Sequence, residues 1–121
     1  MPKLRRNPAA TLAALAASLL AAPGVHAADA TYVGTWATDL AQCKVGQERQ
    51  EAPLVLSKGG YDQHETHCTF KSVNGADGEW TGKSDCIVEG SAEPYDFTLT
   101  VSGDTLTVTD EAGSRDLLKC P

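Results

Sequence analysis

Histidine, cysteine and carboxylate side chains gather in the segment Asp62-Gln63-His64-Glu65-Thr66-His67-Cys68. These side-chain types bind metal ions or transfer protons in proteins. If the segment is one extended strand, residues i and i+3 point to opposite faces, so His64 and His67 do not share a face. Two imidazoles on opposite faces cannot chelate one ion. We therefore expect polar surface residues here, and neither a metal site nor a cofactor.

The two central cysteines each have a glutamate three residues away: Glu65 precedes Cys68, and Glu89 follows Cys86. In a hairpin centred near Asp77, Cys68 lies opposite Cys86 and Glu65 lies opposite Glu89. Glycoside hydrolases use two such carboxylates. However, like charges directly opposite each other destabilise a sheet, and no substrate-binding motif accompanies this pair. The expectation is that the chain is not an enzyme and has no catalytic residue.

The elements that must position these residues are strands. Apolar and polar residues alternate most clearly in 95–101 and 106–109, which predicts a hairpin with one apolar face and one threonine-rich face. Other strands are expected at 32–36, 54–57, 60–73, 79–89 and 115–120, with a loop at 90–94 and a turn of helix at 39–43 capped by Thr38. The predicted fold class is all-β, a small antiparallel meander barrel of about seven or eight strands. An open sandwich is the alternative.

The first 27 residues have the features of a secretory signal peptide. A basic start at residues 3–6 precedes an apolar run at 11–22, which is too short to span a bilayer comfortably. Val25 and Ala27 supply the small residues expected before a cleavage site. We therefore expect a single domain at 28–121, located in the periplasm or secreted, with no membrane association after cleavage.

Removal of the predicted signal peptide makes the chain strongly acidic. The whole chain has 10 Lys and Arg and 16 Asp and Glu, and residues 1–27 contain three of the basic and none of the acidic residues. Seven basic and sixteen acidic residues remain, for a net charge of −9. Such a surface repels nucleic acid and anionic lipid. The expected partner is a basic exported protein, and the sequence does not indicate an oligomeric state.

All four cysteines follow the expected cleavage site: Cys43, Cys68, Cys86 and Cys120. An even number in a short exported chain predicts two disulfides, and without a C-x-x-C pair a zinc site is not expected. The hairpin above pairs Cys68 with Cys86 and leaves Cys43 for Cys120. The sequential pattern, Cys43–Cys68 with Cys86–Cys120, is slightly favoured because cross-strand cystines are geometrically demanding. The pairing therefore stays open.

Gly34-Thr35-Trp36 resembles the G-x-W motif of lipocalin-like barrels. That resemblance implies that Trp36 plugs one end of the barrel, and that a basic residue of the last strand, here Arg115, packs over it. The spacing of tryptophans and cysteines also resembles that of small exported proteobacterial β-barrel proteins of unknown function. Among small barrels, the chain is similar in size to exported bacterial inhibitors of metalloproteases and lysozymes. The segment 57–61 looks like the S-G-x-x-Y loop of the lysozyme inhibitors.

These observations together predict an exported, non-enzymatic binding module, such as a periplasmic inhibitor of a hydrolase. The alternative is a small-ligand or metal-binding protein of lipocalin type. The side chains expected to form the binding surface are Lys58, Tyr61, Glu65 and Glu89.

Overall fold

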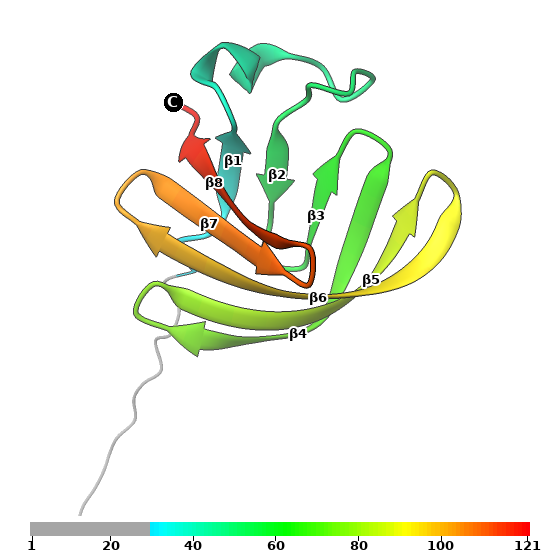
Figure 1. The fold of residues 1–121 in the computed structure, drawn as a ribbon, viewed down its shortest axis with the longest axis vertical. Helices are drawn as coiled ribbons and strands as arrows, with labels where there is room; N and C mark the ends of the chain where they lie inside the picture. The colour runs from blue at the N-terminus through cyan, green and yellow to red at the C-terminus, as the bar shows by residue number, and fades with distance from the viewer. Residues whose placement is uncertain (1–29) are drawn as a thin grey trace, which may run out of the picture.

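Eight strands follow one another along the chain, and each pairs antiparallel with its neighbours in the sequence. They are β1 Gly34–Ala37, β2 Leu54–Leu56, β3 Gly60–Gln63, β4 Thr66–Ala76, β5 Glu79–Val88, β6 Ser91–Ser102, β7 Thr105–Asp110 and β8 Gly113–Lys119. Pairing of β1 with β8 closes the barrel (Figure 1). The computed structural model describes residues 30–121, so the predicted signal peptide lies outside them. The predicted all-β meander barrel is confirmed, and the open sandwich is wrong.

A tight turn and a β-bulge together set the register of the central hairpin. Asp77 and Gly78 both have positive φ, 57° and 88°, and form the two-residue turn between β4 and β5. Turns of this kind match the twist of the strands that they join. The turn pairs Ala76 with Glu79, a register that would set Cys68 opposite Ile87. A bulge between Phe70 and Ser72 shifts the register by one residue, so Cys68 lies opposite Cys86, as predicted.

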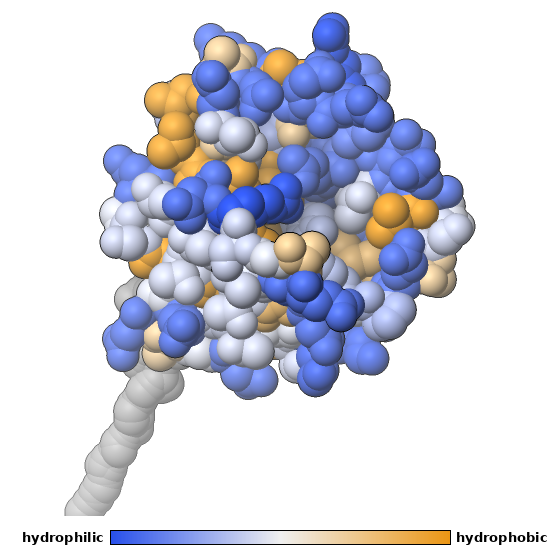
Figure 2. Space-filling model, viewed as in Figure 1, coloured by the Kyte–Doolittle hydropathy of each residue, from blue (hydrophilic) through white to orange (hydrophobic). Residues whose placement is uncertain are grey.

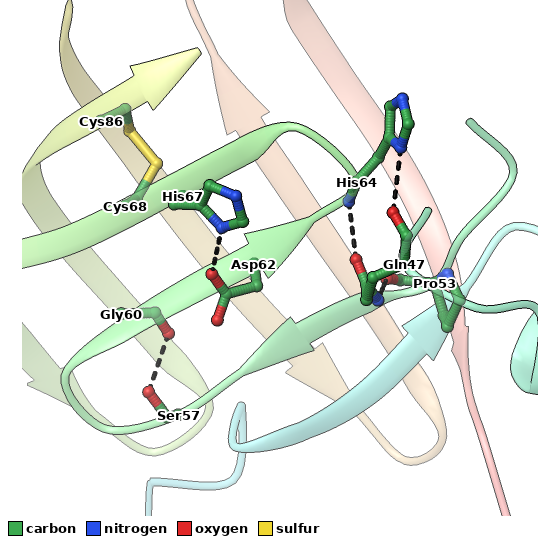
Figure 3. Close-up of polar contacts among 9 residues, drawn as sticks. All are labelled: Gln47, Pro53, Ser57, Gly60, Asp62, His64, His67, Cys68 and Cys86. Atoms are coloured by element: carbon green, nitrogen blue, oxygen red, sulfur yellow. Dashed lines mark hydrogen bonds and ion pairs between the residues drawn. A yellow bond between two sulfur atoms is a disulfide. The ribbon is translucent and has the colours of Figure 1, made fainter. Parts of the chain in front are cut away.

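The single strand predicted at 60–73 is wrong, because the chain reverses within it. His64 and Glu65 form a two-residue turn between β3 and β4, and His64 has a φ of 53°. No glycine, asparagine or proline marks this turn in the sequence. It is held instead by Gln47, whose side-chain oxygen accepts a hydrogen bond from the His64 backbone N–H at 2.6 Å (Figure 3).

Two smaller expectations also differ from the structure. Residues 90–94 are not a loop, because β6 begins at Ser91 and pairs with β5 from the turn onward. The short helix is a 3₁₀ turn, η3 Leu40–Lys44, and its cap is Asp39 rather than Thr38. The Asp39 carboxylate accepts the Ala41 N–H at 2.8 Å, which satisfies a free donor at the start of the helix.

The barrel interior is packed with apolar side chains, which form one buried cluster: Tyr32, Trp36, Leu54, Leu56, Trp80, Phe97, Leu99, Leu106, Val108 and Leu117. Trp36 is fully buried, and its indole N–H donates to the Tyr32 carbonyl at 2.9 Å. The Phe97 ring lies directly over Gly82, where a Cβ atom would clash with it. Burying side chains of this size supplies roughly 1.5–3 kcal/mol each.

A basic residue of the last strand does cover Trp36, but it is Lys119 and not Arg115. The Lys119 ammonium lies 5.5 Å from the centre of the Trp36 ring, within the range of a cation–π interaction. The register explains the difference, since Trp36 of β1 faces Lys119 of β8. Arg115 faces Val108, nearer the start of β8.

The two disulfides are Cys43–Cys120 and Cys68–Cys86, so the slightly favoured sequential pairing is wrong. Cys68 and Cys86 are direct neighbours on adjacent strands, with Cα atoms 4.0 Å apart. The other bridge follows from closure of the barrel. Cys43 lies in η3 just after β1, and Cys120 directly follows β8, the strand that pairs with β1. Two disulfides in so short a chain are typical of an oxidising compartment.

Candidate functional site

Alternate connections of a meander barrel lie at the same end. One end, named here the polar end, carries the turns at 64–65, 89–90 and 111–112 and the loop 45–53. A recess of about 440 Å³ opens there, and every residue that lines it is polar: Gln50, Gln63, His64, Glu65, Thr66, Glu89 and Arg115. The space-filling view shows largely hydrophilic side chains around a hollow on this face (Figure 2). The polar end is therefore a candidate binding surface.

The two glutamates predicted to face each other do lie side by side, on adjacent turns. The Glu89 backbone N–H donates to the Glu65 carbonyl at 3.0 Å. The Glu65 carboxylate lies 3.1 Å from Nε2 of His64, which forms an ion pair when the imidazole is protonated. Among residues 30–121, no basic nitrogen lies within 4.0 Å of the Glu89 carboxylate. The rim of the recess thus carries an acidic group without a salt bridge.

Two tyrosines and an aspartate lie beside the recess, toward the core. The Tyr95 hydroxyl donates to the Asp110 carboxylate at 2.7 Å, and the Tyr61 ring packs edge-on against Tyr95 at 5.9 Å between ring centres. Burial, followed by the hydrogen bond to Asp110, raises the pKa of Tyr95. The same hydrogen bond is the main cause that lowers the pKa of Asp110, and the Arg115 charge acts in the same direction. Asp110 was not predicted from the sequence, since nothing in its local pattern separates it from other turn residues.

We expect Tyr95→Phe to weaken the barrel by about 1 kcal/mol at pH 7, because one hydrogen bond to a carboxylate is lost. The stability that a lowered carboxyl pKa provides is present above its unfolded value, 3.8, and is lost as pH falls through the native value. The difference between wild type and Tyr95→Phe should therefore shrink below pH 4. Urea unfolding at a series of pH values measures it.

The control for this prediction is Tyr61→Phe. Among the described residues, the Tyr61 hydroxyl makes no hydrogen bond to a carboxylate, although burial raises its pKa. Its removal should leave the acid dependence unchanged. A Tyr95→Phe variant whose loss of stability is the same at pH 7 and at pH 2 would contradict the role given to Asp110.

His64 and His67, the two histidines of the segment 62–68, form hydrogen bonds with different parts of the barrel (Figure 3). Nδ1 of His64 lies 3.0 Å from the Gln47 carbonyl and fastens the loop 45–53 to the turn. Nδ1 of His67 lies 2.7 Å from the Asp62 carboxylate, across the β3–β4 pair. Within residues 30–121, no group of three or more His, Cys, Asp or Glu side chains is arranged to hold a metal ion. The two imidazoles therefore act as separate hydrogen-bonding groups.

The residues predicted to form one binding surface do not lie together. Glu65 and Glu89 line the recess, and Tyr61 is half-buried beside Tyr95. Lys58 lies in the β2–β3 turn, at the opposite end of the barrel. It lines a separate groove along β4, which sequence analysis did not indicate.

Comparison of the chain with protein-family models, with curated proteins and with solved structures found no significant match. Within residues 30–121, no helix has the length and apolar character needed to cross a membrane.

Proposed function

We propose that this protein is an exported, non-enzymatic binding module that acts in the periplasm or outside the cell. Its target is a basic exported protein, with lysozyme-like hydrolases as the first class to test, and it binds that target through the polar end. The observation that supports this proposal is the acidic rim: Glu65 and Glu89 lie side by side there, and Glu89 has no salt bridge among the described residues.

The polar end suits recognition of a protein for two reasons. Its turns are anchored to one another, since Gln47 binds the His64 turn and the Glu65 turn binds the Glu89 turn. A rigid surface loses little conformational entropy on binding. In addition, complementary charge speeds the encounter of two proteins and suppresses wrong partners. An acidic rim on a chain of net charge −9 therefore favours a basic target.

The test is the binding rate to a basic lysozyme, with inhibition of the hydrolase as a second readout. We expect the double variant Glu65→Gln/Glu89→Gln to associate roughly tenfold more slowly at low salt, because charges on the rim mainly change the association rate. The difference in association rate between the wild type and the double variant should become smaller as salt is added.

The matched control is Glu79→Gln/Asp104→Asn, which removes the same charge at the opposite end of the barrel. An equal effect of both double variants would mean that only total charge matters, and the proposed surface would be wrong. Absence of binding by the wild type would exclude lysozymes as the target class.

A small polar ligand in the recess is a second candidate, and Arg115 favours it. This guanidinium lines the recess, and among the described residues no carboxylate oxygen lies within 4.0 Å of it. It could therefore pair with an anionic group of a ligand. The two candidates differ in the need for a bound small molecule, which a native mass spectrum of the protein from its own host detects directly.

A further inference from the structure

Among the described residues, one edge of β4 has no partner strand over half its length. β3 pairs with β4 only through Thr66–Thr69, and the last contact on this side is the Phe70 N–H bound to the Gly59 carbonyl at 2.9 Å. β4 then continues to Ala76, paired with β5 alone. Among residues 30–121, no other backbone group binds this edge.

The register identifies which backbone groups point out of this edge. Ala76 and Glu79 flank the two-residue turn and therefore form a hydrogen-bonded pair. Hydrogen-bonded and non-hydrogen-bonded pairs alternate along an antiparallel ladder. Asn74 thus directs its backbone groups to β5, whereas Val73 and Gly75 direct theirs away from it. The free edge offers two N–H donors and two C=O acceptors, two residues apart.

A groove of about 420 Å³ runs along the same edge and is named here the β4 groove. It is lined by Ala30, Tyr32, Lys58, Phe70, Lys71, Ser72, Val73, Gly75 and Trp80. Its aromatic residues contact one another, with the Tyr32 ring centre 5.1 Å from that of Trp80 and 6.5 Å from that of Phe70. Tyr32 and Trp80 are only 4% and 6% exposed, so the apolar surface beside the exposed backbone groups comes mainly from the partly exposed Phe70 and Val73.

The β4 groove is also a basic spot on an acidic protein. Two of the seven basic residues of the predicted mature chain, Lys58 and Lys71, line it. Lys71 lies 3.9 Å from the Asp85 carboxylate. Among the described residues, no carboxylate oxygen lies within 4.0 Å of the Lys58 ammonium. Lys58 is thus placed to attract a carboxylate from outside the chain.

A second free edge, on β6, carries a proline that blocks the addition of a strand. β6 pairs with β7 only from Thr98 onward, so no described strand pairs with this side of residues 91–97. Pro94 lies opposite Asp85, three residue pairs from Val88–Ser91, which flanks the next two-residue turn. By the same alternation, the Pro94 nitrogen faces the open side, where it has no N–H to offer an added strand. Residues 71–76 of β4 contain no proline.

We propose that the β4 groove binds an extended segment of a partner protein by strand addition. The segment pairs its backbone with Val73 and Gly75, places an apolar side chain against Phe70 and Val73, and sets a carboxylate near Lys58. Strand addition takes its affinity from main-chain hydrogen bonds and its specificity from alternate side chains. A second copy of this chain fits less well, because two molecules of net charge −9 repel each other.

This site is separate from the polar end, so each is tested alone. The probe is an acetylated, amidated hexapeptide of alternating threonine and valine that ends in glutamate, since about six residues match the length of the free edge. Amide hydrogen exchange of the mature protein is the readout. We expect exchange at Val73 and Gly75 to slow at least about tenfold with saturating peptide, with no change at Glu65 and Glu89. Trp80 fluorescence should change as well, since Trp80 lines the groove and Trp36 does not.

Two matched pairs of changes make the test specific. Methylating the valine nitrogens removes the donors that face β4 and should abolish protection, whereas methylating the threonine nitrogens should not. Lys58→Glu should weaken binding about tenfold, whereas Lys44→Glu, at an exposed site in η3, should have no effect.

Three results would overturn the proposal. The first is unchanged exchange at Val73 and Gly75 at millimolar peptide. The second is equal sensitivity to both methylated peptides, which would mean that backbone pairing is not involved. The third is concentration-dependent protection of these amides without peptide, which would identify a second copy of the chain as the occupant.

Discussion

The double variant Cys43→Ser/Cys120→Ser is expected to lose about 4 kcal/mol of unfolding free energy. The bridge spans 77 residues, and it therefore restricts most of the unfolded chain. In the chain-entropy account, a loop of this length contributes between about 3 and 5 kcal/mol. The total unfolding free energy of a small barrel is low, so this loss is a large fraction of it. Urea unfolding under oxidising conditions, with the change read from the midpoint, measures the loss.

The single variants provide the control for this expectation. Cys43→Ser and Cys120→Ser each break the same bridge, so either one alone should cost about as much as both together. Losses that add would show that each cysteine contributes by its own packing. A loss under about 1 kcal/mol in the double variant would show that the unfolded chain is already compact without the bridge.

Trp36→Ala is expected to cost about 3–5 kcal/mol, the range for removal of a large aromatic side chain from a core. The side chain is fully buried, and its N–H satisfies the Tyr32 carbonyl, which would lose this partner. Lys119→Met should cost no more than about 1 kcal/mol, since only the cation–π contact is lost. Thermal and urea unfolding of both variants test whether Trp36→Ala loses more stability than Lys119→Met.

Arg115→Met is the matched control for Lys119→Met. The lipocalin resemblance implied that Arg115 covers the tryptophan, but the structure places Lys119 there. We therefore expect Arg115→Met to cost less stability than Lys119→Met, since only a minor charge interaction with Asp110 is lost. A larger loss for Arg115→Met than for Lys119→Met would contradict the observed register of β1 and β8.

The parts of the fold that could be predicted are those with local causes. The alternation in 95–101 and 106–109 reflects a sheet with one buried face, and it appears as the β6–β7 hairpin. The Asp77-Gly78 turn has the residue types that positive φ requires, so the β4–β5 hairpin was predictable from it, whereas the bulge at Phe70–Ser72 that brings Cys68 opposite Cys86 was not. These features depend on residues close together in the chain.

The features that escaped prediction depend on distant contacts. The turn at His64 is held by Gln47, 17 residues earlier, and the polar run 62–67 resembles a strand without that contact. The pairing of Cys43 with Cys120 follows from barrel closure, which no local pattern records. At the candidate site, the meeting of Glu65 and Glu89 could be predicted from hairpin symmetry. The free edge of β4 could not, since it exists only because β3 is short.

The Cys43–Cys120 bridge has a further consequence for the response of the protein to proteolysis. Residues 43–120 form a covalent ring, closed by peptide bonds on one side and the disulfide on the other. A protease that cuts one peptide bond between Lys44 and Lys119, for example in the exposed loop 45–51, opens the ring but releases no fragment. The two segments of the cleaved molecule stay covalently linked. The barrel can therefore re-form after a cleavage that would separate a chain without the disulfide into two fragments.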